Sequence, residues 1–200
     1  MRTLFIYLIF ASSLIAEPSQ WVPLFNGKDL TGWHTLPGGK WEVVDGVITG
    51  TSEKKEKRHG LLVSDKTYKN FILRAKFKVT KGDSGLYFRA LETKTKVAIR
   101  GFQAEVDKSP QVGGLYETAG RAWVKSPDPK LIAKIVKHGD WNQITVTANG
   151  DDITVSLNGV TVTELLGDTK CQKKGHIALQ LHGGQDMHVQ FKDIAILALK

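Results

Sequence analysis

Alternation between apolar and polar positions runs through most of the chain after Trp21. The clearest case is "NFILRAKFKVT" (70–80), in which apolar residues take every second position and Arg or Lys takes most positions between them. Successive side chains of a β-strand point to opposite faces, so this pattern predicts a strand with one buried face and one solvated face. Similar segments recur at "SGLYFRA" (84–90), "GFQAEVD" (101–107) and "GHIALQLHGG" (175–184).

Turn signals separate these segments. Dipeptides that accept a positive φ stand between apolar arms at Asp45-Gly46, Gly82-Asp83, Asn149-Gly150 and Asn158-Gly159. Only "DPKLIAKIVKHG" (128–139) has helical spacing, from a proline near its start to Gly139, which we expect to end the helix. Together these signals predict an all-β domain over residues 21–200, a sandwich of two antiparallel sheets with one short helix.

The first residues have the layout of a secretory signal peptide. Arg2 precedes an apolar run from Leu4 to about Ile15, and this run is too short to span a bilayer. We expect cleavage after Ala16, so that residues 1–16 are a signal and the mature protein is periplasmic or secreted without stable membrane insertion. Cys171 is the only cysteine, which excludes an internal disulfide.

The positive charge is dispersed along the chain. The formal net charge is +8, and the densest cluster, "SEKKEKRHG" (52–60), is interrupted by Glu53 and Glu56. Mixed runs of this kind are usually solvated loops, and no RNA- or DNA-binding signature accompanies it. We therefore expect no nucleic-acid partner.

Polar side chains capable of chemistry take the outward positions of three predicted strands. They are Tyr87, Arg89, Gln103, Glu105, Asp107, Gln180 and His182. A curved sheet gathers such side chains on its concave face, which suits a sugar because aromatic rings stack on it while amides and charges bind its hydroxyls. The pattern predicts a carbohydrate site.

The competing interpretation is an ordinary solvated face, since antiparallel sandwiches commonly expose polar side chains on their outer surfaces. Glu105 and Asp107 weigh against it. They lie about 7 Å apart on one strand face, and their charges repel unless something uses them. Arg89 is expected to neutralise these carboxylates, and His182 to move a proton near neutral pH.

Other residues add less. The six histidines show no paired metal-ligand spacing, so no cofactor is predicted, although a divalent metal held by Glu105, Asp107 or His182 stays an open alternative. Trp123, in the Gly-rich stretch "GGLYETAGRAWV" (113–124), is the best candidate for a sugar-stacking platform at the rim of the groove.

A series of blocks in fixed order resembles one family. They are "PLFNGKDLTGWH", "GKWEVVDGVITGT", "GLLVSDKTYKNFILRAKFKV", "GDSGLYFRA", "GFQAEVD", "GGLYE", "GDWNQITVTANGDDITVSLNGV" and "GHIALQLHGG". From about Trp21 to Leu199 the chain resembles the 3-keto-disaccharide hydrolase domain. The resemblance implies a concanavalin A-like jelly roll, related in shape to laminarinase-type glycoside hydrolases. It also implies secreted proteins that cleave 3-keto-glycosides or 3-keto-disaccharides by hydrolysis, or by elimination followed by hydration.

Ordinary retaining glycosidase chemistry is not expected from this chain. The active strand of laminarinase-type enzymes contains Glu-x-Asp-x-x-Glu, whereas here Pro110 stands at the position of the second Glu. A retaining double displacement needs two carboxyl groups about 5–5.5 Å apart. A 3-keto sugar avoids this need, because its ketone acidifies the hydrogen on C2, and the enolate formed by one base can expel the substituent on C1.

The resemblance and this chemistry give the predicted residues their roles. Either Glu105 or Asp107 is the base, Arg89 or a bound cation steadies the enolate, and His182 protonates the departing group. The residues expected to position hydroxyls are Gln103, Gln180, Tyr87 and Tyr116. The alternatives are a non-catalytic, lectin-like carbohydrate-binding module that uses the same groove, and an interaction domain of an envelope assembly.

Overall fold

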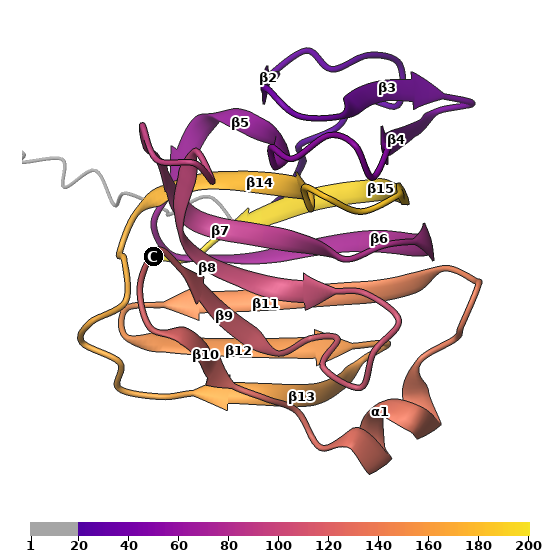
Figure 1. The fold of residues 1–200 in the computed structure, drawn as a ribbon. Helices are drawn as coiled ribbons and strands as arrows, with labels where there is room; N and C mark the ends of the chain where they lie inside the picture. Colours follow the sequence, from indigo (N-terminus) through magenta and orange to yellow (C-terminus); the bar gives the residue numbers. More distant parts are fainter. Residues whose placement is uncertain (1–19) are drawn as a thin grey trace, which may run out of the picture.

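The structure is a computed structural model that describes residues 20–200, and these residues form two packed antiparallel sheets with one short helix (Figure 1). The predicted all-β sandwich is confirmed. The predicted signal peptide, residues 1–16, lies outside the described residues. In residues 20–200 no helix has both the length and the apolar character needed to cross a bilayer.

One sheet, which we call the back sheet, has the strand order β13-β12-β11-β6-β15-β4-β3, with β1 paired to β15. Its strands are β1 (Trp21–Pro23), β3 (Lys40–Val44), β4 (Val47–Ser52), β6 (Phe71–Lys81), β11 (Asn142–Asn149), β12 (Asp152–Leu157), β13 (Val160–Leu165) and β15 (Met187–Ala198).

The other sheet, which we call the front sheet, has the order β10-β9-β8-β7-β14-β5-β2. Its strands are β2 (Trp33–Leu36), β5 (Gly60–Tyr68), β7 (Ser84–Glu92), β8 (Ile99–Val106), β9 (Leu115–Thr118), β10 (Ala122–Lys125) and β14 (Gly175–Leu181).

The core lies between the two sheets and follows the alternation of the sequence. On β6 the apolar side chains Phe71, Leu73 and Phe77 are fully buried, whereas the cations between them face outward. From the front sheet, Phe88 and Phe102 stack with their ring centroids 6.0 Å apart. Each sheet therefore has one apolar face turned to the core and one outer face available for other purposes.

The predicted turn between β3 and β4 and the start of the predicted helix are confirmed, but the helix ends earlier than expected. The turn between β3 and β4 uses positive φ at Asp45 and Gly46, as predicted. The helix α1 (Pro129–Ile135) begins after Asp128, whose carboxylate accepts a hydrogen bond from the Lys130 backbone N–H. It ends at Ile135, not at Gly139, because the next residue is already extended.

Arg89 is the one predicted site residue that the fold places elsewhere. Strict alternation puts it on the outer face with Tyr87, but the register of β7 and β8 shifts between Phe88 and Leu91, and Arg89 has a φ of 48°. This bulge turns the side chain away from the groove and leaves it 1% exposed. The prediction that Arg89 faces the site is wrong because a bulge interrupts the two-residue period.

The Arg89 guanidinium instead joins three segments of backbone. It donates to the carbonyls of Lys69 at 2.6 Å, Gly150 at 2.9 Å and Gln172 at 3.4 Å. The bulge needs a glycine beside it, because a Cβ on Gly175 would lie 2.3 Å from the Arg89 backbone carbon. Arg89 is therefore a structural residue that links the start of β6, the β11–β12 turn and the segment before β14.

We expect Arg89→Leu to lower the free energy of unfolding by at least about 3 kcal/mol, since it leaves several buried carbonyls without a donor. Urea denaturation followed by circular dichroism measures this loss. Arg100→Leu, which removes an exposed arginine of β8, is the matched control and should change the value by less than about 0.5 kcal/mol. Equal effects of the two substitutions would contradict the structural role.

Candidate active site

A pocket of about 410 Å³ hollows the outer face of the front sheet, where β9, β8, β7 and β14 lie in order. It is lined by residues that the sequence singled out: Tyr87, Gln103, Glu105, Asp107, Tyr116, Trp123, Gln180 and His182. The structure thus brings together every predicted site residue except Arg89. Among the described residues, no Lys or Arg lines the pocket.

Strand register explains why these side chains meet. Gly85 pairs with Glu105 and Tyr87 pairs with Gln103 across β7 and β8, while Gln103 also pairs with Tyr116 on β9. Residues directly opposite each other on antiparallel strands point to the same face of the sheet. Three neighbouring strands therefore present their polar side chains to one hollow.

Two carboxyl groups lie close together in the pocket, one buried and one half-buried. Glu105 is 4% exposed, and its carboxyl is within hydrogen-bonding reach of the Asp83 carboxyl, just before β7. Burial, then the hydrogen bond and the charge of Asp83, then the charge of Asp107, raise the pKa of Glu105 well above its ordinary value. Because a second carboxyl group lies close by in a buried setting, Glu105 keeps its proton at neutral pH.

Asp107 extends this acidic cluster toward the end of the strand. Burial is the main cause that raises the pKa of its carboxyl, while hydrogen bonds from Ser109 act in the opposite direction. Its Oδ1 is buried and has no hydrogen-bond partner. An ionised carboxylate with a raised pKa is a stronger base than an exposed one, and the unpaired oxygen leaves room for a proton from a ligand.

The glutamine amides connect the carboxyl pair to the rest of the pocket. Gln103 donates from Nε2 to Glu105 Oε2 at 3.2 Å, and Gln180 donates from Nε2 to the Tyr87 hydroxyl at 3.3 Å. The Oε1 atoms of both glutamines are buried without a partner. Buried polar atoms are normally paired, and each of these free acceptors can take a hydrogen bond from a hydroxyl group in the pocket.

Two further contacts shape the pocket. A Cβ on Gly85 would lie 2.5 Å from Gln103 Oε1, so glycine opposite Glu105 provides the space that the Gln103 amide occupies. The Tyr87 hydroxyl lies 2.7 Å from Thr118 Oγ1, and burial raises the pKa of Tyr87, which therefore stays a neutral hydrogen-bonding group. At the rim, the rings of Tyr116 and Trp123 pack edge to face, with their centroids 5.5 Å apart.

Two histidines lie on the β14 side of the pocket. The rings of His59 and His182 have centroids 4.4 Å apart, and burial, followed by the nearby His182, lowers the pKa of His59 to about 4. His59 is therefore neutral at neutral pH. His182 Nδ1 donates to the Gly183 carbonyl at 2.9 Å, because a carbonyl can only accept. Nε2 is thus the ring nitrogen of His182 that is left to contact a ligand.

Several residues that line the pocket are not among those that the sequence pattern predicts, although the pattern could have indicated one of them. Asp83 falls in a predicted turn, yet continuing the alternation back from Tyr87 and Gly85 places it on the same face. His59 belongs to the mixed-charge segment 52–60, most of which is exposed as expected, and nothing in that pattern marks it. Thr118 and Gln111 come from segments without a clear period.

The sequence left open that Glu105, Asp107 or His182 holds a divalent metal, and the described geometry provides no set of ligands for one. Within residues 20–200, no group of three or more His, Cys, Asp or Glu side chains is arranged so that it could hold a metal ion.

Solved structures of other proteins are similar to this fold. A solved structure from Parabacteroides distasonis, provisionally named a glycosyl hydrolase, is 26% identical, covers 90% of this chain and 100% of that chain, and has a TM-score of 0.64. A carbohydrate-binding module from Bacillus subtilis is 18% identical over 84% of this chain and 96% of that chain, with a TM-score of 0.62. The second likeness concerns the fold alone and agrees with the expected jelly roll.

One curated relative is similar in sequence. A protein of Bacteroides thetaiotaomicron named 3-keto-disaccharide hydrolase is 33% identical over 93 residues, which is 42% of this chain and 32% of that protein. The match thus spans about a third of the relative's length. The model of a family described as the 3-keto-alpha-glucoside-1,2-lyase-like domain matches residues 20–197, and the chain belongs to this family.

Proposed function

We propose that this pocket binds a 3-keto-glycoside and cleaves its glycosidic bond by elimination, after which water adds to the product. The family and the name of the curated relative support a substrate of this class. The observation that carries the proposal is the buried carboxyl of Glu105, with Asp83 and Asp107 beside it, in a pocket with free amide acceptors.

Elimination begins with a base, and Asp107 suits this role best. The raised pKa of Glu105 means that its carboxyl holds a proton at neutral pH and is a poor base. Asp107 has an unpaired buried oxygen and a pKa raised by burial. Asp107 therefore takes the hydrogen from C2, and the electrons of the C–H bond form an enolate on the C3 oxygen.

The enolate needs a hydrogen-bond donor, since Arg89 is not in the pocket. Protonated Glu105 supplies one when its O–H turns from Asp83 to the C3 oxygen of the substrate. A carboxylic acid kept neutral by an apolar site can stabilise an enolate, and such donors act strongly where water is excluded. The Gln103 amide holds the Glu105 carboxyl in place, and the Tyr87 hydroxyl is a second neutral group in the same pocket.

The remaining steps expel the leaving group and add water to the product. The enolate reforms the ketone, a double bond forms between C1 and C2, and the C1–O bond breaks. The departing oxygen takes a proton from Nε2 of His182 in its imidazolium form, whose Nδ1–H stays bound to the Gly183 carbonyl. Water then adds its hydroxyl to C1 and a proton to C2, so that the net result is hydrolysis.

A non-catalytic carbohydrate-binding module is the second candidate. The fold that the chain shares with a Bacillus subtilis carbohydrate-binding module supports it. The pocket's amides and its Trp123–Tyr116 rim suit binding as well as catalysis. The buried, protonated carboxyl of Glu105 favours the enzyme, because burying such a group is costly and simple sugar binding does not need it.

The elimination proposal predicts that a chromogenic 3-keto-glycoside is cleaved while the unoxidised glycoside is not. Glu105→Gln and Asp107→Asn should each lower kcat/KM by at least about 100-fold, because each removes a proton-transferring or oxyanion-binding group. Glu164→Gln, an exposed carboxylate-to-amide change on β13, is the matched control. Substrate binding without cleavage by the unsubstituted protein would instead support the carbohydrate-binding module.

His182→Ala should slow substrates with poor leaving groups at least about tenfold more than those with a nitrophenol leaving group, which needs no proton. Rates for a series of aglycones give this ratio. His188→Ala, on β15 of the back sheet, is the control and should not change it. If His182→Ala slowed the cleavage of all substrates equally, His182 would not be the acid that protonates the leaving group.

The raised pKa of Glu105 predicts a pH dependence of stability. The folded protein keeps a proton that the unfolded chain releases above pH 4.5, the ordinary pKa of this group. The free energy of unfolding should therefore fall, relative to Glu105→Gln, as the pH rises from 4.5 toward the raised pKa. The steepest slope is about 1.4 kcal/mol per pH unit. Urea unfolding of both proteins at a series of pH values measures this slope. If the free energies of unfolding of the two proteins ran parallel with pH, the raised pKa of Glu105 would be contradicted.

A further inference from the structure

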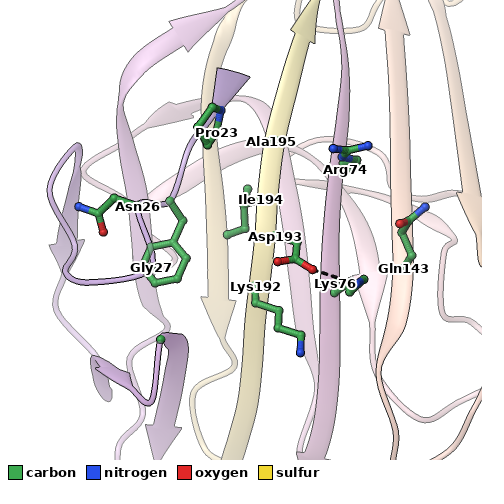
Figure 2. Close-up of a pocket in the computed structure, with 12 residues that line it drawn as sticks. Pro23, Asn26, Gly27, Arg74, Lys76, Gln143, Lys192, Asp193, Ile194 and Ala195 are labelled. Atoms are coloured by element: carbon green, nitrogen blue, oxygen red, sulfur yellow. Dashed lines mark ion pairs between the residues drawn. The ribbon is translucent and has the colours of Figure 1, made fainter. Parts of the chain in front are cut away.

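A second hollow, of about 600 Å³, lies on the outer face of the back sheet (Figure 2). It is formed where β6 and β15 run side by side, with β11 on one flank and the segment after β1 on the other. The core separates it from the pocket of the front sheet, and the two hollows share no lining residue.

The hollow is cationic. Arg74 and Lys76 take alternate outward positions on β6, and Lys192 lies beside them on β15. Among the described residues that line it, Asp193 is the single acid, and its carboxylate lies 2.9 Å from the Lys76 ammonium, as the dashed line of Figure 2 marks. Three cations against one carboxylate leave an excess positive charge for a ligand.

Two tryptophans hold the outer cations in place. The Arg74 guanidinium lies 4.1 Å from the ring centroid of Trp21, and the Lys192 ammonium lies 4.1 Å from that of Trp141. Such cation–π contacts restrict long side chains before any ligand arrives. Less rotamer entropy is then lost on binding, which makes these cations better ligand contacts than free surface lysines.

The surface continues beyond the first hollow. A neighbouring depression of about 360 Å³ shares Lys76, Gln143 and Lys192 with it and adds Lys137 and Asp140, so that cations still outnumber carboxylates across both hollows. The two together make an elongated surface across β6, β15 and β11. A bulge at Asp193, with a φ of 52° and a register shift between Lys192 and Ala195, interrupts the sheet at the centre. Bulges of this kind re-aim side chains next to binding sites.

We propose that this surface binds an acidic polysaccharide, with Arg74, Lys76 and Lys192 contacting its carboxylate or sulfate groups. The amides of Asn26 and Gln143 line the same hollow and suit the hydroxyls of the sugar rings. The elongated shape accommodates several sugar units. Because this site lies on the opposite sheet, it is independent of the chemistry proposed for the front pocket.

Two other polyanions fit less well. Single-stranded nucleic acid binds by stacking bases on open aromatic faces, but cations already lie over Trp21 and Trp141. An anionic bilayer is met by apolar side chains that protrude into it, whereas this surface recedes into a hollow lined with amides. A carbohydrate chain satisfies both the charge and the amides.

Isothermal titration calorimetry of the full chain tests the proposal at about 20 and about 150 mM salt. The probes are a galacturonic acid hexamer, a sulfated maltohexaose and neutral maltohexaose, together with phosphatidylserine vesicles and a thymidine oligonucleotide. We expect at least one acidic hexamer to bind, more weakly at the higher salt, and the neutral hexamer not to bind. The two acidic hexamers distinguish carboxylate from sulfate recognition.

The triple variant Arg74→Gln, Lys76→Gln, Lys192→Gln should weaken this binding at least about tenfold. The control variant Lys94→Gln, Lys130→Gln, Lys134→Gln removes the same charge from exposed positions outside the hollow and should weaken it less than about twofold. Cleavage of the chromogenic 3-keto-glycoside should be the same in both variants, so failure of the front pocket's function would be seen separately.

Three results would overturn the proposal. They are the absence of binding to both acidic hexamers, equal weakening by the two triple variants, and equal binding of the neutral hexamer. Tighter binding of the vesicles or the oligonucleotide, lost in the first triple variant, would assign the surface to a different polyanion and would also overturn it.

Discussion

The register between β7 and β8 is the constraint on which the front pocket depends. It places Gly85 opposite Glu105 and Tyr87 opposite Gln103, so that a glycine leaves space for the Gln103 amide and the carboxyl of Glu105 is enclosed. A slip of one residue would turn every one of these side chains into the core. The apolar face of the same strands, buried against the back sheet, holds this register, and core packing thus sets the geometry of the pocket.

Burial then gives the carboxyl groups their chemical character. In water, Asp83, Glu105 and Asp107 would be three separate anions. In the folded protein, burial, with Asp83 and Asp107 close by, raises the pKa of Glu105, so that Glu105 keeps its proton at neutral pH. In the proposed mechanism Asp107 is the base and protonated Glu105 is the donor to the enolate, so that the pocket supplies both at the same pH. The group proposed to face the enolate is then a neutral carboxylic acid, in place of the arginine that the sequence favoured.

The two outer faces of the sandwich have opposite electrostatic characters. The front pocket contains carboxyl groups and amides, whereas the hollow of the back sheet contains Arg74, Lys76 and Lys192 around one carboxylate. An apolar core lies between them, so each face can carry its own charges while the fold depends on the shared interior. Three cations thus gather around one carboxylate on the back sheet, although the positive charge is dispersed along the sequence.

The sequence by itself determined the sandwich, the main hairpins and most of the polar set around Glu105, because alternation and turn chemistry are local properties that tertiary packing reinforces. Its resemblance to a family determined the class of substrate to consider. Only the tertiary structure decided that Arg89 is buried, since a bulge breaks the two-residue period. It alone joined His59 to the pocket and set the protonation of Glu105, because enclosure and contacts between distant strands have no signature in a linear pattern.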